Sequence, residues 1–259
     1  MAGHPSWASF PRHGDHLFRN ILHQRHLWYT LFHSYGTVCS EDEEGTSMDR
    51  PDTTMMLVVH DAFRRDLARM KFAAAQIDNA DIRSALRSGW QTFSRYLTVH
   101  HTAEDEVLWP SMQEKLGDHT TARNLLHEMT DEHARLDPVL REIDDNLAQG
   151  SADNLEALFD RLAAVLTDHL EHEESTVLPL VQEILTAEEW QAFGDDQRRR
   201  IGFDEAGWFF PWLLDDASAE VHANVLGLVP RPLRLLHRAL WEPRYRMRSP
   251  WNRHPAARH

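Results

Sequence analysis

An internal repeat constrains the fold of this chain more than any other feature of its sequence. Residues 100–110 and 169–179 both begin with histidine, carry glutamate four positions later and a second acidic residue directly after it, and end on proline. Positions i and i+4 of a helix lie one above the other on the same face. Each copy therefore presents an imidazole and a carboxylate together on one side of a helix.

The repeat lies within four long segments of helical character. The first opens at Pro51 and Asp52, which are typical of helix starts, and its apolar residues recur with a helical period. Short breaks separate the segments, and long helices with short connections pack as antiparallel neighbours. The sequence predicts an all-α, up-down-up-down four-helix bundle. Its helices are expected at 51–77, 82–115, 120–148 and 152–185.

Charge and composition divide the chain into three predicted parts. The bundle occupies residues 51–187, and residues 51–195 carry 28 acidic against 12 basic side chains. In residues 196–259, 11 arginines outnumber 7 acidic residues, and residues 207–214 are strongly aromatic. We expect residues 188–259 to form a helical appendage packed on the bundle.

Residues 1–50 are expected to be an N-terminal extension that is disordered or not native, with Met48 as an alternative start. A stripe of histidines in this extension could bind a metal, if the segment is helical. Its members are His16, His23, His26 and His33.

The overall charge limits the classes of partner. A net charge of −14 argues against binding nucleic acid or an anionic membrane surface. No stretch has the roughly 18 apolar residues of a membrane span. The single cysteine, Cys39, can form no intrachain disulfide. These features favour a cytoplasmic protein.

The repeated pairs are candidate metal ligands. They are His100 with Glu104, and His169 with Glu173. Two carboxylates buried in a bundle would repel each other and resist desolvation unless cations neutralise them. Imidazole and carboxylate suit iron better than a metal that prefers thiolate. Two divalent ions, bridged by the carboxylates, would resolve the conflict.

A second pair in the same segment, His101 and Asp105, has equal spacing. Its counterpart in the other copy is Leu170 and Glu174, and leucine cannot ligate. The repeat therefore favours His100 and Glu104 and assigns His101 to the flank of the site. His172 is assigned there too.

The first and third segments each contribute one further histidine. His60 precedes His100 by 40 residues, and His133 precedes His169 by 36. A lone histidine among apolar neighbours is more often a core residue than a ligand. Here each one occupies a similar place in a two-helix unit that ends in a histidine–glutamate pair, so we predict that both bind metal.

An alternative interpretation treats these residues as ordinary exposed helix positions, since the chain has 18 histidines and 41 acidic residues. That interpretation does not explain why the pairs repeat in phase. It also leaves unexplained the shared prolines, Pro110 and Pro179, each of which is expected to kink or end its helix.

With these residues, segment 51–187 resembles the hemerythrin, or HHE cation-binding, family. The resemblance implies a four-helix bundle with an oxo- or hydroxo-bridged centre of two iron ions. It implies terminal imidazole ligands and two bridging carboxylates, Glu104 and Glu173. The imidazoles would be His60, His100, His133 and His169.

One position departs from the oxygen carriers of this family, which place a second histidine four residues before the third-helix ligand. Met129 stands there in this chain. The fifth imidazole is therefore missing or comes from elsewhere, with His127, Asp137 and His172 as candidates. The set of four histidines and two glutamates is more similar to the family's iron–sulfur-repair and nitric-oxide-handling branch. A missing imidazole would leave a coordination position open for chemistry or exchange.

The primary functional prediction is a non-haem di-iron protein that binds O₂ or NO for sensing, detoxification or oxidation. Whether it turns over a substrate as an enzyme stays open. An alternative from another class is an iron- or oxygen-responsive regulatory module that acts on a protein partner through its C-terminal tail. A structural metal such as zinc is a third reading.

Overall fold

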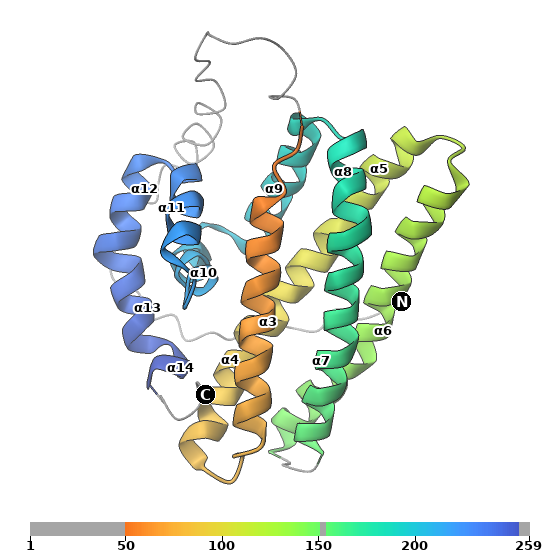
Figure 1. The fold of residues 1–259 in the computed structure, drawn as a ribbon. Helices are drawn as coiled ribbons and strands as arrows, with labels where there is room; N and C mark the ends of the chain where they lie inside the picture. The colour runs from red at the N-terminus through yellow and green to blue at the C-terminus, as the bar shows by residue number, and fades with distance from the viewer. Residues whose placement is uncertain (1–49, 151–153, 254–259) are drawn as a thin grey trace. The chain divides into compact units, whose positions relative to one another are not determined.

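The computed structural model describes residues 50–150 and 154–253 of the chain (Figure 1). These residues form helices and their connections, without β-strands in the described ranges, so the predicted all-α fold is confirmed. The predicted N-terminal extension, with its histidine stripe and Met48, lies outside the described residues.

Four helical segments make up the bundle, and their bounds agree closely with the predicted ones. The first is α3 (Thr54–Ala74), and the third is α6 (Thr120–Gln149), which continues through Pro138. The second and fourth are composite. They comprise α4 (Ala80–Ala103), η1 (Glu104–Leu108) and α5 (Trp109–Leu116), then α7 (Leu155–His172), η2 (Glu173–Val177) and α8 (Leu178–Ile184).

Local sequence sets where these helices begin and end. The side chain of Asn79 accepts hydrogen bonds from the backbone N–H groups of Asp81 and Ile82, which caps α4. Gly150 ends α6 in the left-handed conformation, with φ of 71°. Glycine adopts this conformation without steric cost, so the chain can turn back there toward α7.

The repeated prolines do not end their helical segments, although ending was one of the two outcomes that the sequence predicted. A π-helical turn precedes each of them, and the helix then resumes with Pro110 or Pro179 in its first turn. In these turns the N–H of Trp109 donates to the carbonyl of Glu104, and that of Leu178 donates to Glu173. The wider turn accommodates a residue that has no N–H to donate.

The C-terminal residues form a series of shorter helices that pack beside α3 and α4 (Figure 1). The larger apolar core contains Trp212, Tyr245 and Trp251 together with residues of α3, α4, α6 and α7. The helices are α9 (Ala187–Ile201), α10 (Phe203–Leu213), α11 (Ala219–Leu228), α12 (Arg231–Leu236), η3 (His237–Trp241), α13 (Glu242–Arg248) and α14 (Pro250–Arg253).

A buried polar network fixes these helices to α3. The indole N–H of Trp212 donates to Asp66 over 2.7 Å, and both residues are almost completely buried. Arg69 donates to Asp66 and to Asp215 over 3.2 and 2.9 Å. The Asp66 carboxylate is therefore compensated by hydrogen bonds from both parts of the fold, as a buried charge requires.

Gly89 marks another close approach between the two parts. A Cβ atom at this position would lie 2.1 Å from the ring of Trp251. Only glycine lets α14 come this near to α4, so the sequence of the bundle itself accommodates the C-terminal helices. In the described part of the chain no helix has both the length and the apolar character needed to cross a membrane.

Candidate metal centre

The structure brings all six predicted residues together at the middle of the bundle. Each is buried, with at most 6% of its surface exposed. Together with His101 they form two adjoining groups that share Glu104, and the donor atoms within each group lie within 4.8 Å of one another. One group is His60, His100, Glu104 and Glu173, and the other is His101, Glu104, His133 and His169.

The carboxylate of Glu104 extends between the two groups. Its Oε1 lies 3.1 Å from Nε2 of His100, and its Oε2 lies 3.4 Å from Nε2 of His133. Glu173 faces the first group, with Oε2 at 3.3 Å from Nε2 of His60. One oxygen of Glu104 is thus available to each group, which is the arrangement that a bridging carboxylate requires.

His101 belongs to this cluster, although the sequence argument placed it at the flank. Its ring stacks on that of His133, with centroids 4.1 Å apart, and it contacts His169 edge-on at 5.1 Å. Neighbouring residues on a helix point about 100° apart. His100 and His101 can therefore serve two adjacent groups from one helix.

Comparing the two copies could not have found His101. The repeat reveals residues that occur in both copies, and the counterpart of His101 is Leu170. Because only one copy carries a histidine at this position, a comparison of the two copies excludes His101. The usable signal was the pair of adjacent histidines at a position already known to face inward.

His101 offers a fifth imidazole in the cluster, which bears on the question raised by Met129. Met129 is fully buried in the apolar cluster around Trp109, and a fifth imidazole comes from α4 instead. None of the three sequence candidates for it lies in either group of the described structure. Asp137 is exposed, His127 lines a surface depression beside Arg123, and His172 lies in an outer layer of contacts.

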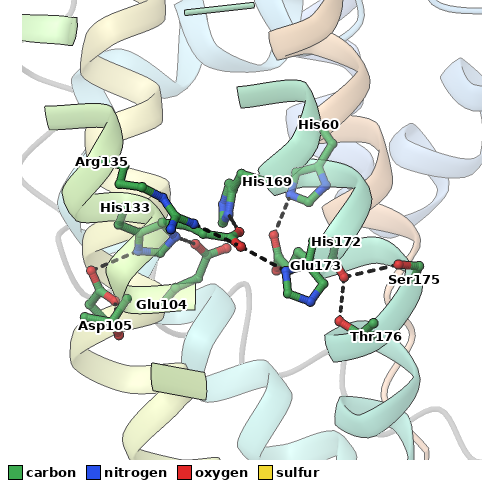
Figure 2. Close-up of polar contacts among 12 residues, drawn as sticks. His60, Glu104, Asp105, His133, Arg135, His169, His172, Glu173, Ser175 and Thr176 are labelled. Atoms are coloured by element: carbon green, nitrogen blue, oxygen red, sulfur yellow. Dashed lines mark hydrogen bonds and ion pairs between the residues drawn. The ribbon is translucent and has the colours of Figure 1, made fainter. Parts of the chain in front are cut away.

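Carboxylates contact the outer ring nitrogens of three of the imidazoles, and two of these contacts cross between the two halves of the bundle. Nδ1 of His133 lies 3.0 Å from Asp105 (Figure 2). The other oxygen of Asp105 accepts a hydrogen bond from Thr130. Nδ1 of His60 lies 2.8 Å from Glu174. Asp105 and Glu174 are the second acidic residues of the two copies, and each contacts a histidine in the other half of the bundle.

Glu132 provides the third outer contact. Its two oxygens lie 2.9 Å from Nδ1 of His169 and 2.9 Å from Nδ1 of His172. A carboxylate on the outer nitrogen fixes the tautomer and orientation of an imidazole and directs Nε2 inward. His172 contacts the same carboxylate as His169 and lies outside both groups of donor atoms.

The two buried glutamates titrate in opposite directions. Burial, reinforced by the charge of Glu173, raises the pKa of Glu104 to about 8. Burial also acts to raise the pKa of Glu173, but the neighbouring His60 outweighs it and lowers that pKa. In the metal-free protein one carboxyl group thus holds a proton at neutral pH while the other is ionised.

The pKa values of the buried histidines also shift in opposite directions. Burial acts to lower the pKa of His60, but Glu173 and Glu174 outweigh it and raise the pKa to about 9. Burial is likewise outweighed at His133, where Asp105 and Glu104 raise the pKa to about 10. Burial lowers the pKa of His100 and His101, so both stay neutral with a nitrogen lone pair free to bind a cation.

The donor set fits cations rather than internal hydrogen bonding. Among the described residues, no hydrogen-bond partner is present for Nε2 of His101, His133 and His169, nor for either oxygen of Glu104 and Glu173. Buried polar atoms left in this way carry a high free-energy cost. Imidazole nitrogens and carboxylate oxygens without thiolate are typical ligands of iron and related divalent metals.

The fold and this cluster define a class: a helical bundle with a buried centre of histidine and glutamate that can hold metal. The family model described as the hemerythrin HHE cation binding domain matches residues 52–181. This match covers half of the chain, which therefore belongs to that family.

A curated relative from Nostoc sp. named DNA nickase is 21% identical to this chain over 152 residues. The match covers 59% of the chain and 41% of the relative, so it spans about two fifths of that protein's length. No solved structure matches the chain.

Proposed function

We propose that this protein binds two iron ions in the bundle and uses them to bind a diatomic ligand, O₂ or NO. The main support for this proposal is the set of inward-facing Nε2 atoms and carboxylate oxygens that lack hydrogen-bond partners in the described structure. The ligands of one ion would be His60 and His100, and those of the other would be His101, His133 and His169. Glu104 and Glu173 would serve both.

The inequality of the two groups supports binding of a small ligand. Iron with nitrogen and oxygen donors favours six ligands, and one group offers three imidazoles while the other offers two. The ion at His60 and His100 would therefore keep a position for an exchangeable ligand. Such a centre supplies electrons and this exchangeable position to a diatomic molecule.

The surrounding side chains would exclude water and limit what reaches the site. Phe63 and Trp109 are fully buried, and their rings lie 5.5 Å from His100 and 6.5 Å from His133. Apolar walls favour an uncharged diatomic ligand over ions and raise the strength of electrostatic interactions inside.

A fifth imidazole changes the balance between the predicted roles. The sequence argument moved away from reversible oxygen carriage because it found only four histidines. With His101 included, the proposal allows reversible binding as well as sensing, detoxification and oxidation.

The regulatory alternative is supported by the contact between the C-terminal helices and the bundle. Trp212 packs on Phe63 at 5.6 Å, and Phe63 packs on His100. A change at the centre could therefore reach α10 through adjacent rings. Truncation at residue 190 separates the two roles: unchanged ligand binding with a lost partner interaction would favour the regulatory module.

We do not extend DNA nicking to this chain. The name of the Nostoc relative describes a protein that the match covers by 41%. A net charge of −14 would repel phosphates, since nucleic-acid affinity depends largely on neutralising them.

The deciding experiment measures iron stoichiometry and optical spectra of untagged protein under O₂, NO and azide. About two irons per chain and new absorption bands on adding NO or azide would support the proposal. The variant His60→Ala with Glu173→Ala should lose iron, whereas exposed His119→Ala should retain it. Unchanged iron in the double variant, or zinc in place of iron in protein from iron-replete cells, would contradict it.

A further inference from the structure

A third π-helical turn in the described residues repeats the layout of the two at the metal centre. In η3 the N–H of Glu242 donates to the carbonyl of His237, and Pro243 follows directly. In η1 and η2 the same layout begins at Glu104 and Glu173, whose side chains face the centre. The corresponding residue of η3 is His237, far along the sequence from that centre.

His237 shares a further property with these glutamates. It is 1% exposed, and neither of its ring nitrogens has a hydrogen-bond partner among the described residues. A buried imidazole in this condition is costly unless something binds it. π-helical turns are frequent at functional sites, and η1 and η2 each present a buried group to the centre.

The imidazole lines a cavity of about 380 Å³ between the C-terminal helices. Most of the lining is polar, including Asp215, Asp216 and Glu242 as well as His222 and Arg246. Arg69 forms ion pairs with Asp215 and Asp216, and Arg246 donates to Glu242 over 2.6 Å. Three carboxylates and two imidazoles thus face one space.

We propose that this cavity binds a divalent transition-metal cation through Nδ1 of His237 and the carboxylate of Glu242. Nδ1 of His237 lies 4.0 Å from Oε2 of Glu242. Two donors each about 2.1 Å from one metal lie at most about 4.2 Å apart, so this spacing leaves room for a cation between them.

The π turn is what brings this pair together. Positions i and i+5 of an α-helix point about 140° apart, at about 100° per residue. A π turn closes its backbone hydrogen bond between i and i+5, so His237 and Glu242 come one above the other. Burial also lowers the pKa of His237, which keeps the imidazole neutral and its lone pair available.

Zn²⁺ is the probe for this site. Untagged full-length protein, loaded with iron and dialysed, is titrated with Zn²⁺ by calorimetry, and bound iron and zinc are counted by mass spectrometry. One Zn²⁺ per chain should bind without displacing iron. Failure to bind a zinc ion, or binding that only replaces iron, would overturn the proposal. Because iron is counted in the same sample, absence of iron bears on the proposed di-iron centre alone.

Three variants test the ligands. His237→Gln and Glu242→Gln should each weaken zinc binding at least about tenfold, as loss of about 1.4 kcal/mol implies. Arg246→Ala should strengthen it, because Arg246 competes for the Glu242 carboxylate and is largely exposed, so its loss does not endanger folding. Exposed His119→Gln is the control for adventitious surface binding. Zinc affinity that is unchanged in His237→Gln, or weakened in Arg246→Ala, would refute the site.

Discussion

Replacing Glu104 with glutamine should stabilise the metal-free protein and abolish the stabilisation that metal provides. In the unfolded chain this carboxyl group has a pKa near its ordinary 4.5, and burial raises it to about 8 in the folded state. Folding at pH 7 therefore requires proton uptake. At about 1.4 kcal/mol per pH unit between 4.5 and 7, this costs about 3 kcal/mol.

The sign follows from the direction of the shift. A carboxyl group with a raised pKa destabilises the folded state as pH rises from 4.5 to 8, because the unfolded chain releases its proton first. The glutamine amide is neutral at every pH and needs no proton. Metal-free Glu104→Gln should thus exceed the wild type by about 3 kcal/mol at pH 7. For a chain of this size that corresponds to a melting temperature about 6–12 °C higher.

Bound metal should reverse this order of stability, so that the wild type becomes more stable than Glu104→Gln. A ligand at 1,000 times its dissociation constant stabilises the folded state by about 4.1 kcal/mol, which exceeds the gain of about 3 kcal/mol in the variant, and the variant has lost the shared carboxylate. Circular dichroism melts in chelator at pH 7 and pH 5, and anaerobically with ferrous iron, measure both effects. A metal-free variant that melts below the wild type at pH 7 would refute the reasoning. So would a difference that does not shrink toward pH 5.

Three further predictions follow from single contacts. Asp105→Asn, which weakens the acceptor that orients an imidazole of the centre, should lower metal affinity about 10- to 100-fold, measured as iron retained after dialysis against chelator; full retention would contradict this role. His101→Ala should reduce iron from two ions per chain toward one, whereas His172→Ala should retain both; equal losses would refute the assignment of the fifth imidazole. Gly89→Ala should destabilise the fold by about 1–3 kcal/mol in denaturant titrations, since the new Cβ would lie 2.1 Å from the ring of Trp251. It should also alter the fluorescence of Trp251. A stability equal to wild type would show that α14 can move away freely.

The internal repeat was the source of most of the predictions about the fold and the site. Helical spacing alone placed His100 with Glu104 and His169 with Glu173 on inward faces, because positions i and i+4 share a face in any α-helix. The helix bounds followed from breaks such as Gly117 and Gly150, where the chain must turn. These are local consequences of backbone geometry, which is why the sequence sufficed for the helical fold and for placing each of these pairs on one helix face.

The outer carboxylates show where local reasoning stops. Asp105 orients His133 and Glu174 orients His60, across 28 and 114 residues of sequence. Both acids were visible in the repeat, but their partners lie on helices of the other half. Only the packing of the two halves against each other decides which histidine each acid meets.

The sequence by itself determined the class of fold, the four-helix register and the symmetric part of the site, since these depend on periodicity and spacing within single helices. Tertiary structure decided the rest. It brought His101 into the centre, because a residue present in only one copy leaves no trace in a repeat, and it widened the helices ahead of Pro110 and Pro179. It also placed His237 near Glu242 at a cavity. That proximity depends on a π turn and on neighbouring helices, neither of which a local sequence pattern predicts.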